Sequence, residues 1–263
     1  MSSPVQIEPE RPFVVPEAVV PLRGQPAESA EMVSQLLFGE HGTILATAGT
    51  WCQVRRAFDG YEGWVDAKMI EPVAATAENL GQGPFVIEGS LVFPDGSHLR
   101  LPAGVRLPGQ VSPSTPNFLI GPRAFSISSS IQLTHIRTKA SVVATTGLFF
   151  HTPYLWGGVS SFGLDCSGLV QTVFRMCGVN LPRDASQQIA YGDEVPFAQR
   201  QAGDLAYFSN INRDRVSHVG ILSDHDHILH ASGRVRRDAF SAQGIVHSAS
   251  GHLTHQLISI RRC

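Results

Sequence analysis

The chain has 263 residues, of which 43% are hydrophobic and 16% are charged, a composition typical of a soluble globular protein with room for two or three hydrophobic cores. The formal net charge of −2 gives no general attraction to nucleic acid or to an anionic membrane, so neither is an expected partner. No apolar run approaches the ~20 residues that are needed to cross a bilayer.

The first ten residues and the cysteine pattern bear on the cellular compartment. The segment MSSPVQIEPE lacks the basic start, the apolar segment and the small-residue cleavage site of a secretory signal. The four cysteines are scattered, without the paired spacing of a disulfide framework, which fits a reducing compartment. We therefore expect a cytoplasmic protein.

Short β-like runs separated by Gly-containing turns fill the chain from residue 11 to residue 72. They lie at residues 18–22, 34–37, 43–46, 51–54 and 63–65. Several short strands at this spacing predict a small β-barrel. We assign this barrel to residues 12–72.

Residues 75–127 repeat this pattern more faintly. Strand-like runs lie at residues 85–87, 90–93, 98–101 and 117–120. We predict a second small barrel, although the density of Pro and Gly between them is equally compatible with an irregular linker. A boundary is expected at residues 126–130, followed by a third domain over residues 131–263 that opens with a helix over residues 131–150.

The segment DCSG at residues 165–168 places a cysteine at a predicted helix start. The apolar residues that follow it recur at helical spacing, namely Leu169, Val170, Val173, Phe174 and Cys177, and Gly178 and Pro182 end the helix. Free N–H groups and the helix dipole stabilise a negative charge at this position by up to ~2 kcal/mol. Cys166 is therefore the predicted nucleophile, whereas Cys52, Cys177 and Cys263 are interpreted as inert.

Two histidines lie in a predicted β-hairpin further along the chain. The runs at residues 216–222 and 228–232 flank the polar turn SDHDH and contain His218 and His230. A register centred near Asp224 puts both imidazoles on one face of the hairpin, and a register shifted by one residue would separate them. The two histidines would then supply Cys166 with a base and with a group that orients the base.

A zinc site made of Cys166, His218 and His230 is the alternative interpretation, because one thiolate and two imidazoles form a known catalytic ligand set. The helix N-terminus explains the same cysteine without a metal. We expect no metal and no other cofactor.

Six segments carry a resemblance to a known family. They are PYLWGG (153–158), DCSGLV (165–170), LPRDASQQ (181–188), AGDLAYF (202–208), SHVGI (217–221) and HASG (230–233). In this order they resemble the NlpC/P60 cysteine peptidases, which have a papain-like α+β fold and cleave peptidoglycan peptides. The order Cys, His, His differs from that of the circularly permuted relatives, in which the histidine precedes the cysteine.

The first half carries a second resemblance. The segments at residues 31–40 and 59–65, with Trp51 between them, resemble a bacterial SH3-like domain. One or two such barrels before an NlpC/P60 domain, without an export signal, resemble the cytoplasmic γ-D-glutamyl-L-diamino-acid endopeptidases. This resemblance implies hydrolysis of the γ-D-Glu to diamino-acid bond in murein peptides that begin L-Ala-γ-D-Glu, in murein peptide recycling.

The resemblance also implies roles for individual residues. His218 would take the proton of Cys166 while His230 orients His218. Tyr154 and the backbone N–H of Cys166 would hold the oxyanion. Ser167 and Ser186 match serines that contact substrate, with helix capping as the alternative role.

A further group of residues matches those that bind the free α-amine of the substrate. It comprises Glu31, Tyr61 and Asp165, and Glu28 is an alternative to Glu31. Two carboxylates and a phenolic oxygen suit an ammonium group.

Three other functions remain as alternatives. A secreted hydrolase that remodels the cell wall would use the SH3-like domains as anchors. A peptide-binding or scaffold protein would need no intact catalytic set, and an acyltransferase or deamidase would resolve the same thioester with an amine in place of water.

Overall fold

The computed structural model describes residues 10–74, 79–135, 138–210 and 215–263. These residues form two compact units that divide between His135 and Ile136. Residues 1–9, on which the expected cytoplasmic location partly rests, lie outside the described residues, as does the predicted start of the second barrel at residue 75.

The first unit opens with an antiparallel sheet in the order β3-β2-β6-β5-β4-β1-β7. Its strands are β1 (Arg11–Val14), β2 (Val19–Arg23), β3 (Met32–Leu37), β4 (His41–Ala48), β5 (Trp51–Arg56), β6 (Glu62–Asp66) and β7 (Glu71–Pro72), with the 3₁₀ turn η1 (Ala67–Met69) before β7. Alternate residues of β2 and β5 are buried and pack with Phe13, Leu36 and Ile44 into one core. All five runs predicted from this segment are strands, because the period-2 pattern marks a sheet with one buried face.

A second antiparallel sheet follows, in the order β10-β11-β8-β12 with β9 also paired to β8. Its strands are β8 (Phe85–Val92), β9 (His98–Leu101), β10 (Asn117–Ile120), β11 (Arg123–Ile127) and β12 (Gln132–Thr134). The two runs expected at residues 85–87 and 90–93 are one strand, and the sheet continues past the expected boundary at residues 126–130. The SH3-like character of this sheet stays a prediction.

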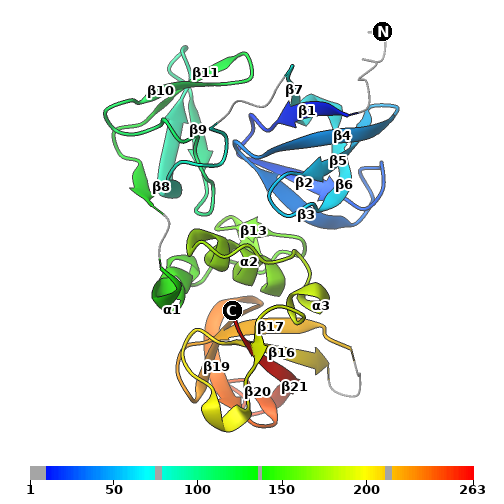
Figure 1. Cartoon of the computed structure of the whole chain (residues 1–263), viewed down its shortest axis with the longest axis vertical. Helices are drawn as coiled ribbons and strands as arrows, with labels where there is room; N and C mark the ends of the chain where they lie inside the picture. Colours follow the sequence, from blue (N-terminus) through cyan, green and yellow to red (C-terminus); the bar gives the residue numbers. More distant parts are fainter. Residues whose placement is uncertain (1–9, 75–78, 136–137, 211–214) are drawn as a thin grey trace. The chain divides into compact units, whose positions relative to one another are not determined.

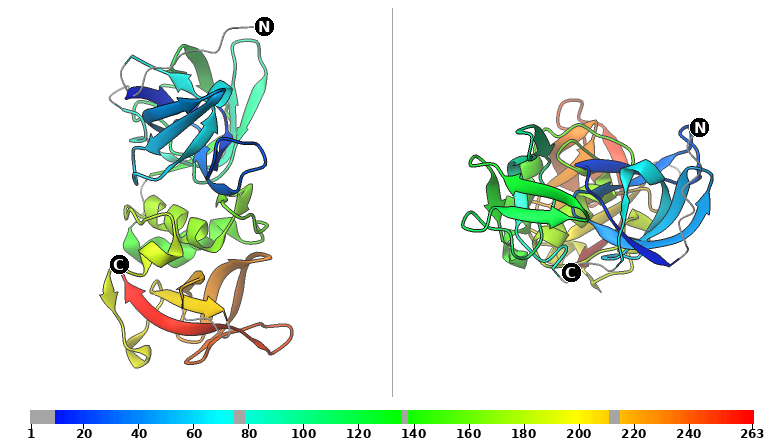
Figure 2. Two further views of the ribbon diagram at one scale, coloured as in Figure 1. Left: turned by 90° about the vertical axis from the view of Figure 1, so that its right-hand side faces the viewer. Right: turned by 90° about the horizontal axis from the view of Figure 1, so that it is seen from above.

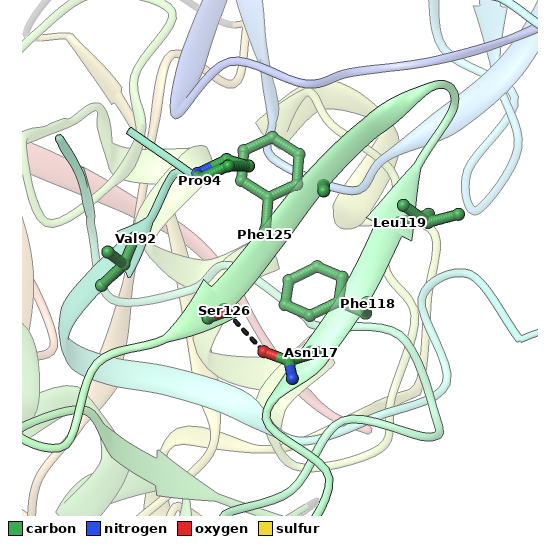
Figure 3. Close-up of a pocket in the computed structure, with 8 residues that line it drawn as sticks. Val92, Pro94, Asn117, Phe118, Leu119, Phe125 and Ser126 are labelled. Atoms are coloured by element: carbon green, nitrogen blue, oxygen red, sulfur yellow. Dashed lines mark hydrogen bonds between the residues drawn. The ribbon is translucent and has the colours of Figure 1, made fainter. Parts of the chain in front are cut away.

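One apolar pocket of about 400 Å³ lies in this second sheet. Figure 3 shows the rings of Phe118 and Phe125 in it, beside a hydrogen bond between Ser126 and Asn117. None of the predicted site residues lines this pocket.

In its described residues, the second unit contains three short α-helices, a two-stranded sheet of β13 and β14, and a larger sheet of seven strands. The helices are α1 (Val142–Thr146), α2 (Cys166–Met176) and α3 (Ala185–Gln188), with the 3₁₀ turns η2 (Lys139–Ser141), η3 (Gly147–Phe149) and η4 (Phe197–Gln199). The strands are β13 (Val159–Ser160), β14 (Gly163–Leu164), β15 (Asp193–Glu194), β16 (Leu205–Asn210), β17 (His218–Leu222), β18 (His227–Ser232), β19 (Arg234–Ser241), β20 (Gly244–Val246) and β21 (Leu253–Arg262). Helices and strands are mixed, as the α+β prediction requires.

The larger sheet closes on itself. Its order is β15-β21-β16-β17-β18-β19-β20, and β20 also pairs with β21, so β16 to β21 form a closed barrel of six strands. Helix α2 packs on the outside against β17 and β18 (Figures 1 and 2). Strand β17 is buried along its whole length, because α2 covers one of its faces and the other face lines the barrel interior.

The opening helix predicted over residues 131–150 is wrong in its first part. Residues Gln132–Thr134 form β12, which pairs with β8. Helical structure in the described part of this segment consists of η2, α1 and η3. The β-branched residues of α1 (Val142–Thr146) have low helix propensity, and pairing with another strand outweighs the local pattern at residues 132–134.

Among the described residues, no helix has the length and apolar character needed to cross a membrane.

Candidate active site

Helix α2 begins at Cys166, as predicted, and its N-cap is Asp165. The Asp165 side chain accepts a hydrogen bond from the Gly168 N–H at 2.7 Å, which satisfies one of the free donors of the first turn. Ser167 is therefore not the capping residue of α2. Its hydroxyl instead donates to Asp165 Oδ1 at 3.2 Å and accepts from Arg183 at 2.8 Å.

The first turn of α2 packs directly against the PYLWGG segment. A Cβ atom added to Gly168 would lie 2.1 Å from the carbonyl oxygen of Gly158, and one added to Gly158 would lie 2.3 Å from that of Gly163. Gly157 has a φ of 78° and donates its N–H to Asp165 Oδ2 at 2.9 Å. The glycines of both motifs are required because two backbones approach each other without room for side chains.

A buried ion pair fixes the cap. The guanidinium of Arg183 bonds both carboxylate oxygens of Asp165, and the two side chains are 1% and 9% exposed. With the N–H groups of Gly157 and Gly168 and the Ser167 hydroxyl, this carboxylate accepts five hydrogen bonds. An ionised carboxylate has about four lone-pair sites, so the acceptor sites of Asp165 are already occupied by hydrogen bonds from the protein.

The LPRDASQQ segment is attached to the same turn of α2. Gln188 donates to the carbonyls of Ser167 and Pro182 at 3.1 and 2.8 Å. Ser186 lies in α3, where it is exposed to solvent, and the residue at the N-cap position of that helix is Asp184. This segment therefore supports the first turn of α2 through Arg183 and Gln188.

The predicted hairpin is formed by β17 and β18, with Ile221 opposite Leu229. The turn is centred on His225, one residue beyond the expected centre, but the register has the parity that places His218 and His230 on one face. His218 Nε2 and His230 Nδ1 are 2.8 Å apart. The two imidazoles are therefore brought together as predicted.

These imidazoles point to the barrel side of the sheet. His218 contacts the ring of Phe208, a member of the interior cluster. On its other side His218 stacks on His255 of β21, with ring centroids 4.2 Å apart and an interplanar angle of 25°. Because Nε2 bonds His230, Nδ1 is the ring nitrogen of His218 that could act as a base.

Cys166 lies next to the start of β17. Its thiol accepts hydrogen bonds from the backbone N–H groups of Val219 and Ser167, and Val219 directly follows His218. Burial raises the pKa of the thiol to about 12, and the charge of Asp165 adds to this effect. Burial and the neighbouring His230 hold the pKa of His218 well below its ordinary value.

The resting pair is therefore a neutral thiol and a neutral imidazole. The N-terminus of α2 acts in the expected direction, since the backbone N–H of Ser167 lowers the pKa of the thiol, but desolvation of a buried charge outweighs this effect in the resting state. A neutral imidazole is the protonation state that a general base requires.

Tyr154 stays protonated beside this pair. Burial raises the pKa of its hydroxyl to about 12, and the charge of Asp165, together with that of Cys166 when it is a thiolate, acts in the same direction. Its backbone is held by the hydrogen bond from its N–H to the Gly233 carbonyl at 3.0 Å. A protonated phenol can donate to an oxyanion, which is the role predicted for it.

The residues predicted to bind the substrate amine do not all belong to one unit. Glu31 and Tyr61 lie in the first unit, where Glu31 is exposed and Tyr61 is half-buried against the first core. The alternative residue, Glu28, is exposed and forms an ion pair with Arg23 at 3.2 Å. The roles of Glu31, Tyr61, Glu28 and Asp165 in amine binding stay predictions.

Sequence reasoning missed three residues of this site, Arg183, Asp238 and His255. Arg183 was within reach, because it lies inside the LPRDASQQ segment. Asp238 and His255 reach the histidines through strand pairings of β19 and β21, which no local pattern reveals.

The described residues contain no group of three His, Cys, Asp or Glu side chains arranged to hold a metal ion. For the alternative zinc interpretation, both ring nitrogens of His230 already lie at hydrogen-bonding distance from other side chains, Nδ1 from His218 and Nε2 from Asp238. The assignment of Cys166, His218 and His230 as nucleophile, base and orienting group stays a prediction.

Two family models match the chain. The NlpC/P60 family matches residues 151–254, and the bacterial dipeptidyl-peptidase Sh3 domain matches residues 22–70. The γ-D-glutamyl-L-lysine dipeptidyl-peptidase of Bacillus subtilis (strain 168) is 30% identical over 214 residues, which are 75% of this chain and 71% of the relative. The protein of the same name from Bacillus cereus (strain ATCC 10987 / NRS 248) is 26% identical and covers 76% of this chain and 67% of its own.

Solved structures share the fold. An NlpC/P60 family protein from Bacillus cereus ATCC 10987 has a TM-score of 0.77 at 20% identity, with 95% of this chain and 99% of that chain covered. An NlpC/P60 endopeptidase from Photobacterium damselae subsp. piscicida has a TM-score of 0.69 at 16% identity, with 97% and 72% covered.

Proposed function

Because the chain belongs to the NlpC/P60 peptidase family, with an N-terminal SH3-like domain, we propose that it is a cysteine peptidase of murein peptides. The bond hydrolysed is that between γ-D-Glu and an L-diamino acid in short peptides with a free N-terminal L-Ala. We place this activity in murein peptide recycling in the cytoplasm. The observation that carries the proposal is Cys166 at the N-terminus of α2, beside the backbone of Val219, while the ring of the preceding residue, His218, bonds His230.

The proposed reaction uses the neutral pair directly. As the Cys166 sulfur attacks the γ-carbonyl carbon, its proton passes to His218 Nδ1, and His230 accepts the hydrogen bond from Nε2–H. The Tyr154 hydroxyl and the backbone N–H of Cys166 hold the oxyanion, each donor lowering the barrier by about 3 kcal/mol.

The thioester forms when the bond to the diamino acid breaks. His218 returns the proton to the leaving α-amine, and the free diamino acid portion departs. Water then attacks the thioester with His218 as base, and the product carries the γ-carboxylate of D-Glu while Cys166 regains its proton.

The names of the relatives make L-Lys the first diamino acid to test. Purified protein is assayed with L-Ala-γ-D-Glu-L-Lys, the diaminopimelate analogue, the N-acetylated forms of both peptides, and intact murein sacculi. We expect cleavage of a free peptide and at least a tenfold lower kcat/KM for its acetylated form, which is about 1.4 kcal/mol. Equal turnover of free and acetylated peptides, or release from sacculi, would favour the wall-remodelling hydrolase.

Two controls separate the remaining alternatives. Activity that survives EDTA and is lost with iodoacetamide supports thiol chemistry, whereas loss with EDTA and restoration by zinc supports the metal site of Cys166, His218 and His230. Glu31→Gln and Tyr61→Phe are then measured for the ratio of free to acetylated turnover. A ratio equal to that of the wild type in both variants would remove Glu31 and Tyr61 from amine binding.

A further inference from the structure

Asp238 is a buried carboxylate that the reaction above does not use. It lies on β19, where it is 1% exposed, and its Oδ2 atom is 3.0 Å from Nε2 of His230. The same oxygen accepts from Arg236 Nε at 2.8 Å. The other oxygen, Oδ1, accepts from the backbone N–H and the hydroxyl of Ser248 at 3.1 and 2.9 Å.

These contacts hold the Asp238 carboxylate in one position and keep it ionised. Burial acts to raise the pKa of Asp238, but hydrogen bonds from His230 and Ser248 outweigh it and hold the pKa well below its ordinary value. The other titratable groups around His230 are His218, His247, His255 and Arg236. None of them is an anion, so Asp238 supplies the negative charge behind this group.

An ionised carboxylate accepts hydrogen bonds and cannot donate them. The proton between Asp238 and His230 must therefore lie on His230 Nε2. Because a neutral imidazole carries one proton, His230 Nδ1 is then an acceptor, and the 2.8 Å contact requires the proton of His218 on Nε2. His218 Nδ1 then carries a lone pair and is the nitrogen of that ring that can accept a proton.

We propose that Asp238 is a positioning residue that fixes the tautomers of His230 and, through it, of His218, so that His218 Nδ1 is the base for Cys166. This role rests on the proposed cysteine-peptidase function. It extends the predicted set of Cys166, His218 and His230 by a fourth member.

The variant Asp238→Asn tests this role. Its amide has one acceptor oxygen, and if this oxygen remains with the Ser248 N–H, the NH₂ group faces His230 and favours the opposite tautomers of both rings. Loss of a tautomer-fixing carboxylate in contact with the base costs about 10⁴-fold in rate. Because Asp238 acts through one further ring, we expect a fall of at least about 100-fold in kcat with KM unchanged.

The matched control is Asp224→Asn. Asp224 also bonds a histidine and an arginine, His227 at 2.9 Å and Arg237 at 2.7 Å, but it lies in the exposed turn before β18. We expect wild-type kcat and KM for this control.

Two measurements keep the test independent of the substrate. The rate of Cys166 alkylation by iodoacetamide at pH 7.5 should fall at least tenfold in Asp238→Asn and recover as the pH rises, because hydroxide then removes the thiol proton. In the wild-type protein, ¹⁵N NMR of the imidazoles should find His230 and His218 protonated on Nε2. The proposal would be overturned if either ring were protonated on Nδ1, or if Asp238→Asn were alkylated at the wild-type rate with the wild-type pH dependence. If alkylation and tautomers are as expected but no murein peptide is cleaved, only the proposed substrate is rejected.

Discussion

The buried pair of Arg183 and Asp165 allows a quantitative prediction about how the start of α2, and with it the proposed nucleophile Cys166, is held in place. Arg183→Met keeps the length and the apolar stem of the side chain but removes the charge, which leaves the Asp165 carboxylate buried without its cation. Breaking a buried pair from one side costs about 3–5 kcal/mol. Asp165 retains hydrogen bonds from Gly157 and Gly168, so we expect the lower end, about 3 kcal/mol of unfolding free energy.

The reverse change should cost about as much. Asp165→Asn preserves the helix cap, since Asn is a good N-cap residue, but strands the Arg183 charge in a site where its side chain is 1% exposed. The double variant leaves no unpaired buried charge and should lose about 2 kcal/mol, far below the ~6 kcal/mol that additivity would give.

The assay is native-state hydrogen exchange of the amides of α2 in the full chain, because two compact units need not unfold in one transition. Arg237→Met is the control: it breaks an ion pair with Asp224 at 2.7 Å whose side chains are 47% and 42% exposed, and should change stability by less than about 1 kcal/mol. Additive losses in the double-mutant cycle, or single losses no larger than that of the control, would refute the assignment of Arg183 as the support of the cap.

Four further changes have definite expected outcomes. Cys166→Ala should abolish hydrolysis and leave circular dichroism unchanged; activity above a few per cent of wild type would remove it as nucleophile. His218→Ala should slow alkylation of that cysteine at pH 7.5 and move its rate profile toward the thiol pKa of about 12; an unchanged profile would show that another group takes the proton. Burial lowers the pKa of His255 to about 4, so this ring binds a proton more readily in the unfolded chain and the free energy of unfolding should fall as pH drops from 6.5 toward 4. Hydrogen exchange at pH 7 and pH 5 should therefore show a smaller loss of stability between these pH values in His255→Phe than in the wild type. Gly168→Ala forces a Cβ to 2.1 Å from the Gly158 carbonyl and should lose about 1–3 kcal/mol by the same exchange measurement; wild-type stability would mean that the two backbones can separate.

The sequence by itself predicted what depends on neighbours along the chain. The periodicity after residue 166 and the turn between residues 222 and 228 located α2 and the hairpin, because helix caps and strand alternation follow from local backbone geometry. The even separation of His218 and His230 then allowed one shared face, and the order of the six segments identified the family.

What the tertiary structure decided depends on pairings between distant segments. Closure of the barrel by β20 and β21, the strand at residues 132–134 and the contact of Asp238 with His230 all depend on strand register, which the local pattern does not fix. The resting protonation state of Cys166 also depends on contacts between distant segments. Local sequence predicted a dipole that favours a thiolate, but the depth at which Cys166 is buried, and with it the larger desolvation energy, is set by how α2 packs on β17.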